Sequence, residues 1–516
     1  MSTLVSFLWH MHQPFYKDLA RDRYVMPWAY LHATKDYYGM PALLKQFPQV
    51  HQTFNLVPSL IVQIEEYAQG KAHDPSYDLA FLPTDRFTDE DRRLVLDNFF
   101  PIPVRTMVQP FPRYLELLEK KQRGESFSDQ DLRDVQVWWS LAWIDQDLRP
   151  RELVEKGREF SEADKLYVRE LVHKTINQVI PVYREVQHAG SIEISTTPFY
   201  HPILPILINS RVDDPNVPVD VRVPEDAREQ LVRAREFMKD RFGAYPQGLW
   251  PSEGSVSDEV AQLVAATGFR WMATDEGILQ KSGVDLGWDN RRRLFRPYER
   301  AGLRIFFRDR GFSDAIGFQY MHGPARDGAH DLIRRIKEVG DGAHVVIALD
   351  GENPWDYYEN SGRDFLRYLF EGIQTDSAIE AVTLSEACDR LTATPLDRLA
   401  AGSWAGANFQ IWIGHPEDHQ AWRWILRARE ALMSRKPELT EEQWKLAYEE
   451  LLIAEGSDWM WWFGNDFSSE QDAVFDALFR HHIGNVFRFA GLPLPDDLSQ
   501  PIKKNLEGRR SVMPPP

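Results

Sequence analysis

The segment HVVIALDGENPWDYYEN (344–360) joins an uninterrupted apolar run to a cluster of acidic and aromatic residues. A short apolar run rich in Val and Ile is typical of a strand that is buried on both faces, as in a parallel sheet. Asp350 is the first polar residue after the run, and Gly351 follows it. The segment therefore predicts an α/β fold in which a carboxyl group ends a buried strand.

Similar apolar runs recur along the chain, with helical patterns between several of them. The other runs are LVSFLWH (4–10), QTFNLVP (52–58), SIEIST (191–196), QGLWPSE (247–253), FRWMATD (269–275), LRIFFRDR (303–310) and AVTLSEA (381–387). Helices are predicted in SDEVAQLVAATG (257–268), with Ser257 at its start and Gly268 at its end, and in RDGAHDLIRRIKEVG (326–340). This alternation predicts parallel strands in a barrel or doubly wound sheet, with functional residues at their C-terminal ends.

Two regions depart from the alternation. Residues 84–186 are almost entirely helical in pattern, including DLRDVQVWWSLAWI (131–144), which predicts a helical insertion between the second and third strands. After about residue 395 three helices are predicted: QAWRWILRAREALMSR (420–435), TEEQWKLAYEELLIAEG (440–456), where Thr440 and Gln443 match a capping box, and QDAVFDALFRHHIGNVFRFAG (471–491). We expect a catalytic domain over 1–395 and a helical domain over 396–516, whose last residues, SVMPPP, should be disordered.

Composition limits the partners of the protein. Lys and Arg number 60 and Asp and Glu number 78, so the formal net charge is −18. This balance argues against binding to nucleic acid or an anionic membrane and suits a neutral substrate. The one cysteine, Cys388, excludes a disulfide framework and a Cys-based zinc site. The N-terminus lacks the basic and apolar regions of a signal peptide, and no apolar window is long enough to span a bilayer, so we expect a cytoplasmic protein.

Two acidic residues are candidates for chemistry. Glu253, in GLWPSEGSVSDE (248–259), follows an apolar run and precedes a helix, whose N-terminus favours the ionised form of a carboxyl. An ionised carboxylate is a candidate nucleophile, and a structural acid is the alternative. Burial at a strand end raises the pKa of Asp350, which suits a general acid. Such a pair is what cleavage of a glycosidic bond requires. For Glu352 and Asp356, a role in holding the loop is expected instead.

Aromatic and basic residues accompany these acids. The chain has 17 Trp, and aromatic faces stack on sugar rings, although a large core also uses Trp. Candidate walls are Trp250, Trp355, Tyr357 and Tyr358. Arg310 can orient a carboxylate or form a structural ion pair.

The first run ends in WHMHQP (9–14), which places His10 and His12 on one face of a strand. Hydrogen bonds to sugar hydroxyls, a core histidine pair and a zinc site are all open for them. A zinc site needs further ligands, for which His201 and Asp275 are available at other strand ends. We expect no metal.

The ordered motifs resemble those of glycoside hydrolase family 57. They are HQP (12–14), IEISTTPFYHPILPIL (192–207), LWPSEGSVS (249–257) and LDGENPW (349–355), followed by SWAGANFQIWIGHPED (403–418) and AEGSDWMWWFGNDFSS (454–469), which resemble the amylase and amylopullulanase branch. The resemblance runs over nearly the whole chain.

The resemblance implies an α/β fold with an incomplete (β/α)7 barrel and a C-terminal α-helical bundle that completes the active-site cleft. One of the eight runs would then be peripheral. It also implies retaining hydrolysis of α-glucans such as starch, glycogen and maltodextrin at α-1,4 bonds, with α-1,6 bonds left open. Glu253 would be the nucleophile and Asp350 the general acid/base, about 5–6 Å apart, without a cofactor. The expected substrate contacts are His10, His12, His201, Trp250, Asp275, Arg310, Trp355, Trp404 and Trp459.

Three alternatives remain open at this point, while a branching enzyme is disfavoured because LWPSEGSVS (249–257) and LDGENPW (349–355) resemble the amylase branch more closely. A 4-α-glucanotransferase would use the same carboxyl pair and pass the sugar to another sugar instead of water. A metal-dependent deacetylase acting on polysaccharides would use a similar barrel. A catalytically silent glucan-binding protein would not need both Glu253 and Asp350. The oligomeric state does not follow from the sequence.

Overall fold

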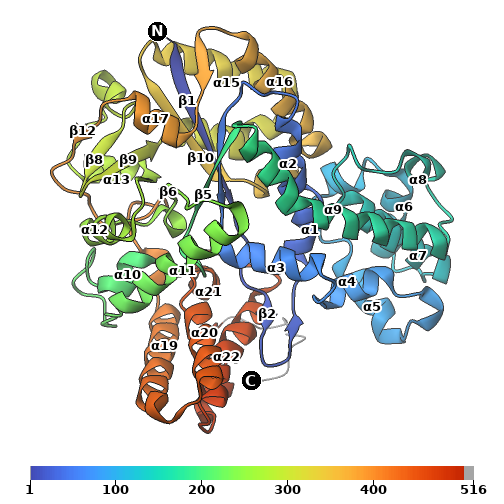
Figure 1. Cartoon of the computed structure of the whole chain (residues 1–516). Helices are drawn as coiled ribbons and strands as arrows, with labels where there is room; N and C mark the ends of the chain where they lie inside the picture. Colours follow the sequence, from blue (N-terminus) through green and yellow to red (C-terminus); the bar gives the residue numbers. More distant parts are fainter. Residues whose placement is uncertain (1, 505–516) are drawn as a thin grey trace.

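The computed structural model describes residues 2–504 and has a parallel sheet at its centre (Figure 1). In this part of the chain seven strands follow one another across the sheet, each parallel to its neighbours. Their order is β10 (His344–Asp350), β1 (Thr3–Met11), β4 (Gln52–Leu56), β5 (Ile192–Thr196), β6 (Gly248–Leu249), β7 (Trp271–Asp275) and β9 (Leu303–Arg308). All residues of β1 are buried, as expected for a strand covered on both faces.

Seven of the eight predicted runs are confirmed as strands of this series, and the eighth is wrong. AVTLSEA (381–387) contains only the end of β11 (Ile379–Ala381), a short strand that pairs with β1 outside the series. The rest begins helix α17 (Leu384–Arg390), because Thr383 and Glu386 form a capping box. The helix-start signal in this segment therefore outweighs its β-branched residues.

Strands β9 and β10 form the two ends of the series and approach each other. The backbone amide of Asp309 donates to the carbonyl of Val346 at 2.8 Å, and Arg308 Nη1 donates to the carbonyl of Ala348 at 2.9 Å. Across residues 2–504 no ladder joins the two strands; instead β8 (Tyr298–Arg300) and β12 (Thr394–Pro395) extend the β9 edge. The mixed sheet with its many helices is an α/β fold, and closure into a (β/α)7 barrel stays a prediction.

Helices fill the connections between the strands. Helices α1 (Trp28–Thr34) and α2 (Asp36–Leu44) follow β1. The helical insertion between β4 and β5 is confirmed, but it begins at residue 58 rather than 84. It contains α3 (Pro58–Ala68), α4 (Pro75–Phe81), α5 (Asp89–Asn98), α6 (Pro112–Gln122), α7 (Asp129–Ala142), α8 (Arg151–Lys156) and α9 (Glu162–His188). Most of it projects to the right of the sheet in Figure 1.

The later connections also carry helices, and both helices predicted there are confirmed as α12 and α15. In chain order these elements are α10 (Leu204–Asn209), α11 (Pro224–Phe242), α12 (Asp258–Thr267), α13 (Glu276–Lys281), α14 (Arg310–Asp314), α15 (Ala325–Val339), α16 (Arg363–Thr375) and α18 (Gln410–Ile413). Ser257 caps α12 and Gly268 ends it in the left-handed conformation, as the sequence predicts.

The C-terminal helices lie below the sheet in Figure 1, where α19 (Pro416–Arg435), α20 (Glu441–Ala454) and α22 (Asp472–Phe489) are side by side. The short helix α21 (Asp458–Phe463) precedes α22. The capping box of Thr440 and Gln443 is confirmed at the start of α20. A domain boundary at residue 395 stays a prediction, and SVMPPP lies outside the described residues. Within residues 2–504, every helix is too short or too polar to cross a lipid bilayer.

Candidate active site

Glu253 lies just after β6, in the short turn Ser252–Gly254. Its backbone adopts φ 58° and ψ 24°, a left-handed conformation that costs a non-glycine residue about 1–3 kcal/mol. Its side chain is 14% exposed. Two contacts from residue Trp404 fix it: the indole Nε1 donates to Oε2 at 2.9 Å, and the Trp404 backbone amide donates to the Glu253 carbonyl at 2.9 Å.

The surroundings of Glu253 favour its neutral form. Burial, with the nearby carboxyls of Asp350 and Asp458, raises the pKa of Glu253 to about 8, and hydrogen bonds from Trp404 and Ser457 oppose that rise. The expectation that a helix N-terminus keeps Glu253 ionised is wrong. Helix α12 begins only at Asp258 and Ser257 already caps it, so burial dominates.

Asp350 is the last residue of β10 and is partly buried. Asn353 Nδ2 donates to its Oδ2 at 3.0 Å. Burial raises the pKa of Asp350, as predicted, and the Asn353 hydrogen bond, His12 and Arg308 act in the opposite direction. The charge of Asp350 also raises the pKa of Glu253, so ionisation of Asp350 disfavours ionisation of Glu253.

Histidines from two strand ends form a cluster beside this pair. His10 Nδ1 lies 2.7 Å from Asn55 Oδ1, and His10 Nε2 lies 3.1 Å from His201 Nε2. His201 Nδ1 lies 2.8 Å from the hydroxyl of Ser457 and 3.8 Å from Glu253 Oε1. Both ring nitrogens of His10 and of His201 therefore have partners within the protein.

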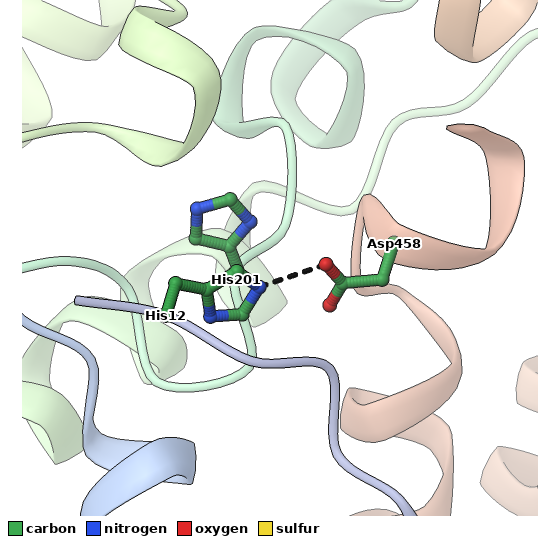
Figure 2. A group of neighbouring side chains, drawn as sticks. All are labelled: His12, His201 and Asp458. Atoms are coloured by element: carbon green, nitrogen blue, oxygen red, sulfur yellow. Dashed lines mark hydrogen bonds and ion pairs between the residues drawn. The ribbon is translucent and has the colours of Figure 1, made fainter. Parts of the chain in front are cut away.

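His12 completes the cluster and lies near further potential metal ligands. Its Nε2 lies 2.7 Å from Asp458 Oδ1, and its ring stacks on that of His201 with centroids 3.8 Å apart (Figure 2). Potential ligand atoms of His12, His201 and Asp458 lie within 4.8 Å of one another. However, the two rings are nearly parallel and Asp458 faces His12, so the lone pairs do not converge as tetrahedral ligation requires. The arrangement is that of a hydrogen-bonded cluster.

Asp275, which the sequence offered as a further ligand or substrate contact, forms ion pairs within the protein. It is fully buried between two arginines, Arg308 Nε at 3.0 Å and Arg310 Nη2 at 2.5 Å. Its charge is thereby satisfied inside the protein. The structural ion pair that was the alternative for Arg310 is confirmed, and contact of Asp275 with a ligand stays a prediction.

Several predicted substrate contacts are buried, and most of them are hydrogen-bonded within the protein. Each of the following is at most 3% exposed: His10, His201, Trp250, Trp355 and Trp459. The indole of Trp355 donates to the Gly351 carbonyl at 2.8 Å, and that of Trp459 donates to the Ile453 carbonyl at 2.9 Å. Tyr358 is likewise 3% exposed. Contact of these side chains with substrate stays a prediction.

Other predicted contacts keep exposed surface. The side chain of His12 is 11% exposed and that of Arg310 42%, while Trp404 is partly buried and Tyr357 is exposed. Their contact with substrate stays a prediction.

Three further site residues did not emerge from the sequence as candidates: Ser457, Asp458 and Asn353. Ser457 and Asp458 lie in AEGSDWMWW, at the junction of α20 and α21, and Asn353 lies three residues after Asp350. A polar Ser-Asp pair between two helical patterns was the available signal for the first two.

Comparison with known proteins identifies the family of this chain. The sequence profile of glycosyl hydrolase family 57 matches residues 6–399, which include both Glu253 and Asp350. The chain belongs to glycosyl hydrolase family 57.

Individual relatives of this family 57 member are distant. A putative alpha-amylase of Methanocaldococcus jannaschii is 24% identical over 251 residues, which are 46% of this chain and 48% of that protein, so the match spans about half of the curated relative. Among solved structures, a branching enzyme from Thermococcus kodakaraensis is 14% identical, with a TM-score of 0.65 over 100% of this chain and 98% of that one. An alpha-amylase from Thermotoga maritima is 14% identical, with a TM-score of 0.59 over 95% and 93%. At these identities the structures establish a shared fold.

Proposed function

We propose that this family 57 member is a retaining glycosidase that cleaves α-glucans by double displacement. The observation that carries the proposal is the pair Glu253 and Asp350, two largely buried carboxyls at strand ends, of which Asp350 raises the pKa of Glu253. A retaining glycosidase needs two carboxyls that share one proton, one as nucleophile and one as acid. The putative alpha-amylase and the structural neighbours that act on α-glucans support the substrate class.

The reaction follows from the position of the shared proton. In the reactive form the proton is on Asp350, and the donors Trp404 and Ser457 favour the ionised form of Glu253. Asp350 protonates the glycosidic oxygen while Glu253 attacks the anomeric carbon, which gives a β-linked glycosyl ester. Asp350 then takes a proton from water while the water oxygen attacks the anomeric carbon. This attack breaks the ester bond to Glu253 and gives a product with α configuration. This course requires the two carboxyls to lie about 5 Å apart when substrate is bound.

Product analysis tests the proposal. The purified protein is incubated with amylose, pullulan and maltotriose, and the products are separated by size. We expect glucose and maltose from maltotriose, with the α-anomer appearing first in a proton NMR time course. Products longer than maltotriose would assign the chain to glucanotransfer with the same residues. No cleavage of any of the three, or first release of the β-anomer, would overturn the proposal.

Bond specificity is read from the same incubations. Cleavage of amylose alone indicates α-1,4 specificity, whereas release of maltotriose from pullulan indicates α-1,6 cleavage. The deacetylase alternative gains no support, because the profile that matches the chain is that of a glycosyl hydrolase.

A further inference from the structure

Ser457 brings the C-terminal helices into contact with the catalytic pair. It lies between α20 and α21 and is 2% exposed. Its backbone amide donates to the carbonyl of His201 at 3.0 Å, and the preceding Gly456 forms an antiparallel bridge with Pro202. A Cβ at Gly456 would lie 2.7 Å from the Tyr200 carbonyl oxygen, so this close approach requires glycine.

The hydroxyl of Ser457 serves two partners with one proton. Its oxygen lies 2.8 Å from His201 Nδ1, which is itself 3.8 Å from Glu253 Oε1, and the hydroxyl lowers the pKa of Glu253 by favouring its ionised form. A serine hydroxyl donates one hydrogen bond and accepts others. When it donates to Glu253 it must accept from His201, and when it donates to His201 it can only accept from Glu253.

The constraint extends through His201 to His10 and Asn55. Burial lowers the pKa of His10 to about 3, and burial with the neighbouring His12 and His10 lowers that of His201 well below its usual range. Both rings are therefore neutral, and each offers one N–H and one acceptor nitrogen. Because His201 Nε2 faces His10 Nε2, and His10 Nδ1 faces the amide of Asn55, the tautomer of one ring sets that of the other.

The contacts show one direction of this chain of hydrogen bonds, because His10 Nδ1 faces the oxygen of the Asn55 amide. That oxygen also accepts from Thr197 Oγ1 at 2.8 Å, and Asn55 Nδ2 donates to Ser195 Oγ at 3.2 Å. The opposite direction requires the Asn55 amide to turn over.

With Glu253 ionised, Asn55 donates to His10, His10 to His201, His201 to Ser457, and Ser457 to the carboxylate. With Glu253 protonated, every hydrogen bond points the other way and Asn55 accepts through its oxygen. Each ring keeps one proton in both states, so the only proton gained or lost is that of Glu253. An asparagine can end the chain in either state because its amide offers both a donor and an acceptor.

We propose that Ser457 is a positioning residue that couples the ionisation of Glu253 to the direction of the hydrogen bonds through His201, His10 and Asn55. The role of this coupling in catalysis rests on the proposed function, in which Glu253 is the nucleophile. The titratable groups that face Glu253 are Asp350, Asp458 and, at 3.8 Å, the neutral ring of His201. The two carboxyls raise the pKa of Glu253, and the Ser457 and Trp404 hydrogen bonds lower it, so Ser457 helps Glu253 to reach its reactive form.

The test follows the titration of Glu253 without substrate. Carbon-13 NMR of protein labelled at the glutamate carboxyl, with Glu253→Gln to assign the signal, gives the midpoint of Glu253. In Ser457→Ala we expect the midpoint to rise by roughly half a pH unit or more, since one hydrogen bond to the carboxylate is lost. Ser457→Thr, which keeps a hydroxyl, should remain close to the wild type. The control Ser434→Ala removes an exposed serine of α19 and should change nothing.

A second readout needs no variant. Nitrogen-15 shifts of labelled histidine report which nitrogen of His10 carries the proton, and we expect it to change from Nδ1 to Nε2 as Glu253 ionises. An unshifted midpoint in a folded Ser457→Ala protein, or a His10 tautomer that stays the same across the titration of Glu253, would overturn the proposal. Neither readout involves turnover, so the proposed function is tested separately by the product analysis.

Discussion

The two candidate catalytic carboxyls are held by different parts of the molecule. Glu253 receives a hydrogen bond from Trp404, and Ser457 favours its ionised form; both residues come from the C-terminal part of the chain. Asp350 receives its bond from Asn353, three residues further along the same loop. The proposed nucleophile therefore depends on how the C-terminal segments pack against the sheet, whereas the proposed acid depends on one local turn.

The loop of Asp350 is itself fixed by the first half of the chain. Lys35, buried between α1 and α2, forms an ion pair with Asp356, and the hydroxyl of Thr106 in the helical insertion donates to the Asp356 carbonyl. A buried lysine paired with a carboxylate holds its partner in one place, because breaking the pair leaves an uncompensated charge. The expectation that Asp356 holds the loop is thereby confirmed.

The largest expected effect is that of Glu253→Gln. If Glu253 is the nucleophile, no glycosyl ester forms, and we expect kcat on amylose to fall by roughly 10⁵-fold, the scale seen when other enzymes lose a covalent nucleophile. The loss should persist with an aryl α-maltoside, because a better leaving group does not replace the nucleophile. Activity within tenfold of the wild type would remove Glu253 from the mechanism.

Asp350→Asn should differ from Glu253→Gln in its dependence on the leaving group. Loss of the acid costs about 10²–10⁴-fold on amylose. On a nitrophenyl α-maltoside the first step needs no protonation, so the loss there should be much smaller. Comparing the two substrates for both variants separates the roles, and equal losses of Asp350→Asn on both substrates would contradict the assignment of Asp350 as the acid.

Trp404→Phe tests the hydrogen bond that Trp404, which is distant in sequence, donates to Glu253. The indole N–H is lost while an aromatic ring remains packed against Trp250. A hydrogen bond to a charged group contributes about 1.5–3 kcal/mol, so kcat/KM should fall by roughly 10- to 100-fold with little change in the melting temperature. Trp444→Phe, which alters a ring stacked on Tyr448 in α20, is the matched control. An unchanged kcat/KM for Trp404→Phe would show that this hydrogen bond does not support the nucleophile.

Asn353→Ala tests the local support of Asp350 and should have the smallest effect. The Asn353 bond lowers the pKa of Asp350, so its loss raises that pKa. Because the reaction requires protonated Asp350, activity should persist to higher pH, and the alkaline limb of the kcat/KM profile should move upward. Asn290→Ala removes a similar bond, to Asp285 on an exposed loop, and should leave the profile unchanged. A downward shift for Asn353→Ala would contradict the sign of this argument.

The strand-end carboxyls could be predicted from the sequence, and most of their partners could not. Asp350 and Glu253 each follow an apolar run, and a run that ends in a carboxyl fixes its place at the edge of a parallel sheet. Ser457 and Trp404 reach Glu253 only through long-range packing, which no local pattern specifies. The short β6 shows the same limit: Gly248 and Leu249 are the only residues of QGLWPSE that pair as a strand.

The exposure of the aromatic residues could not be predicted from the sequence. Trp250, Trp355 and Trp459 lie beside the acidic motifs in sequence, yet all three are at most 1% exposed. The sequence does not distinguish a tryptophan that packs in the core from one that lines a cleft, because its exposure depends on which elements cover it. Trp404, which only the family resemblance suggested, is the tryptophan that contacts the proposed nucleophile.

Trapping of the glycosyl ester tests the central claim most directly. A 5-fluoro α-glucosyl or α-maltosyl fluoride forms the ester quickly and releases it slowly, so the modified enzyme can be digested and sequenced by mass spectrometry. The account predicts one added glycosyl group on the peptide that contains GLWPSEGSVS (248–257), located at Glu253 and absent in Glu253→Gln. A label on Asp350 or Glu352, or turnover of the reagent with no ester on Glu253, would contradict it.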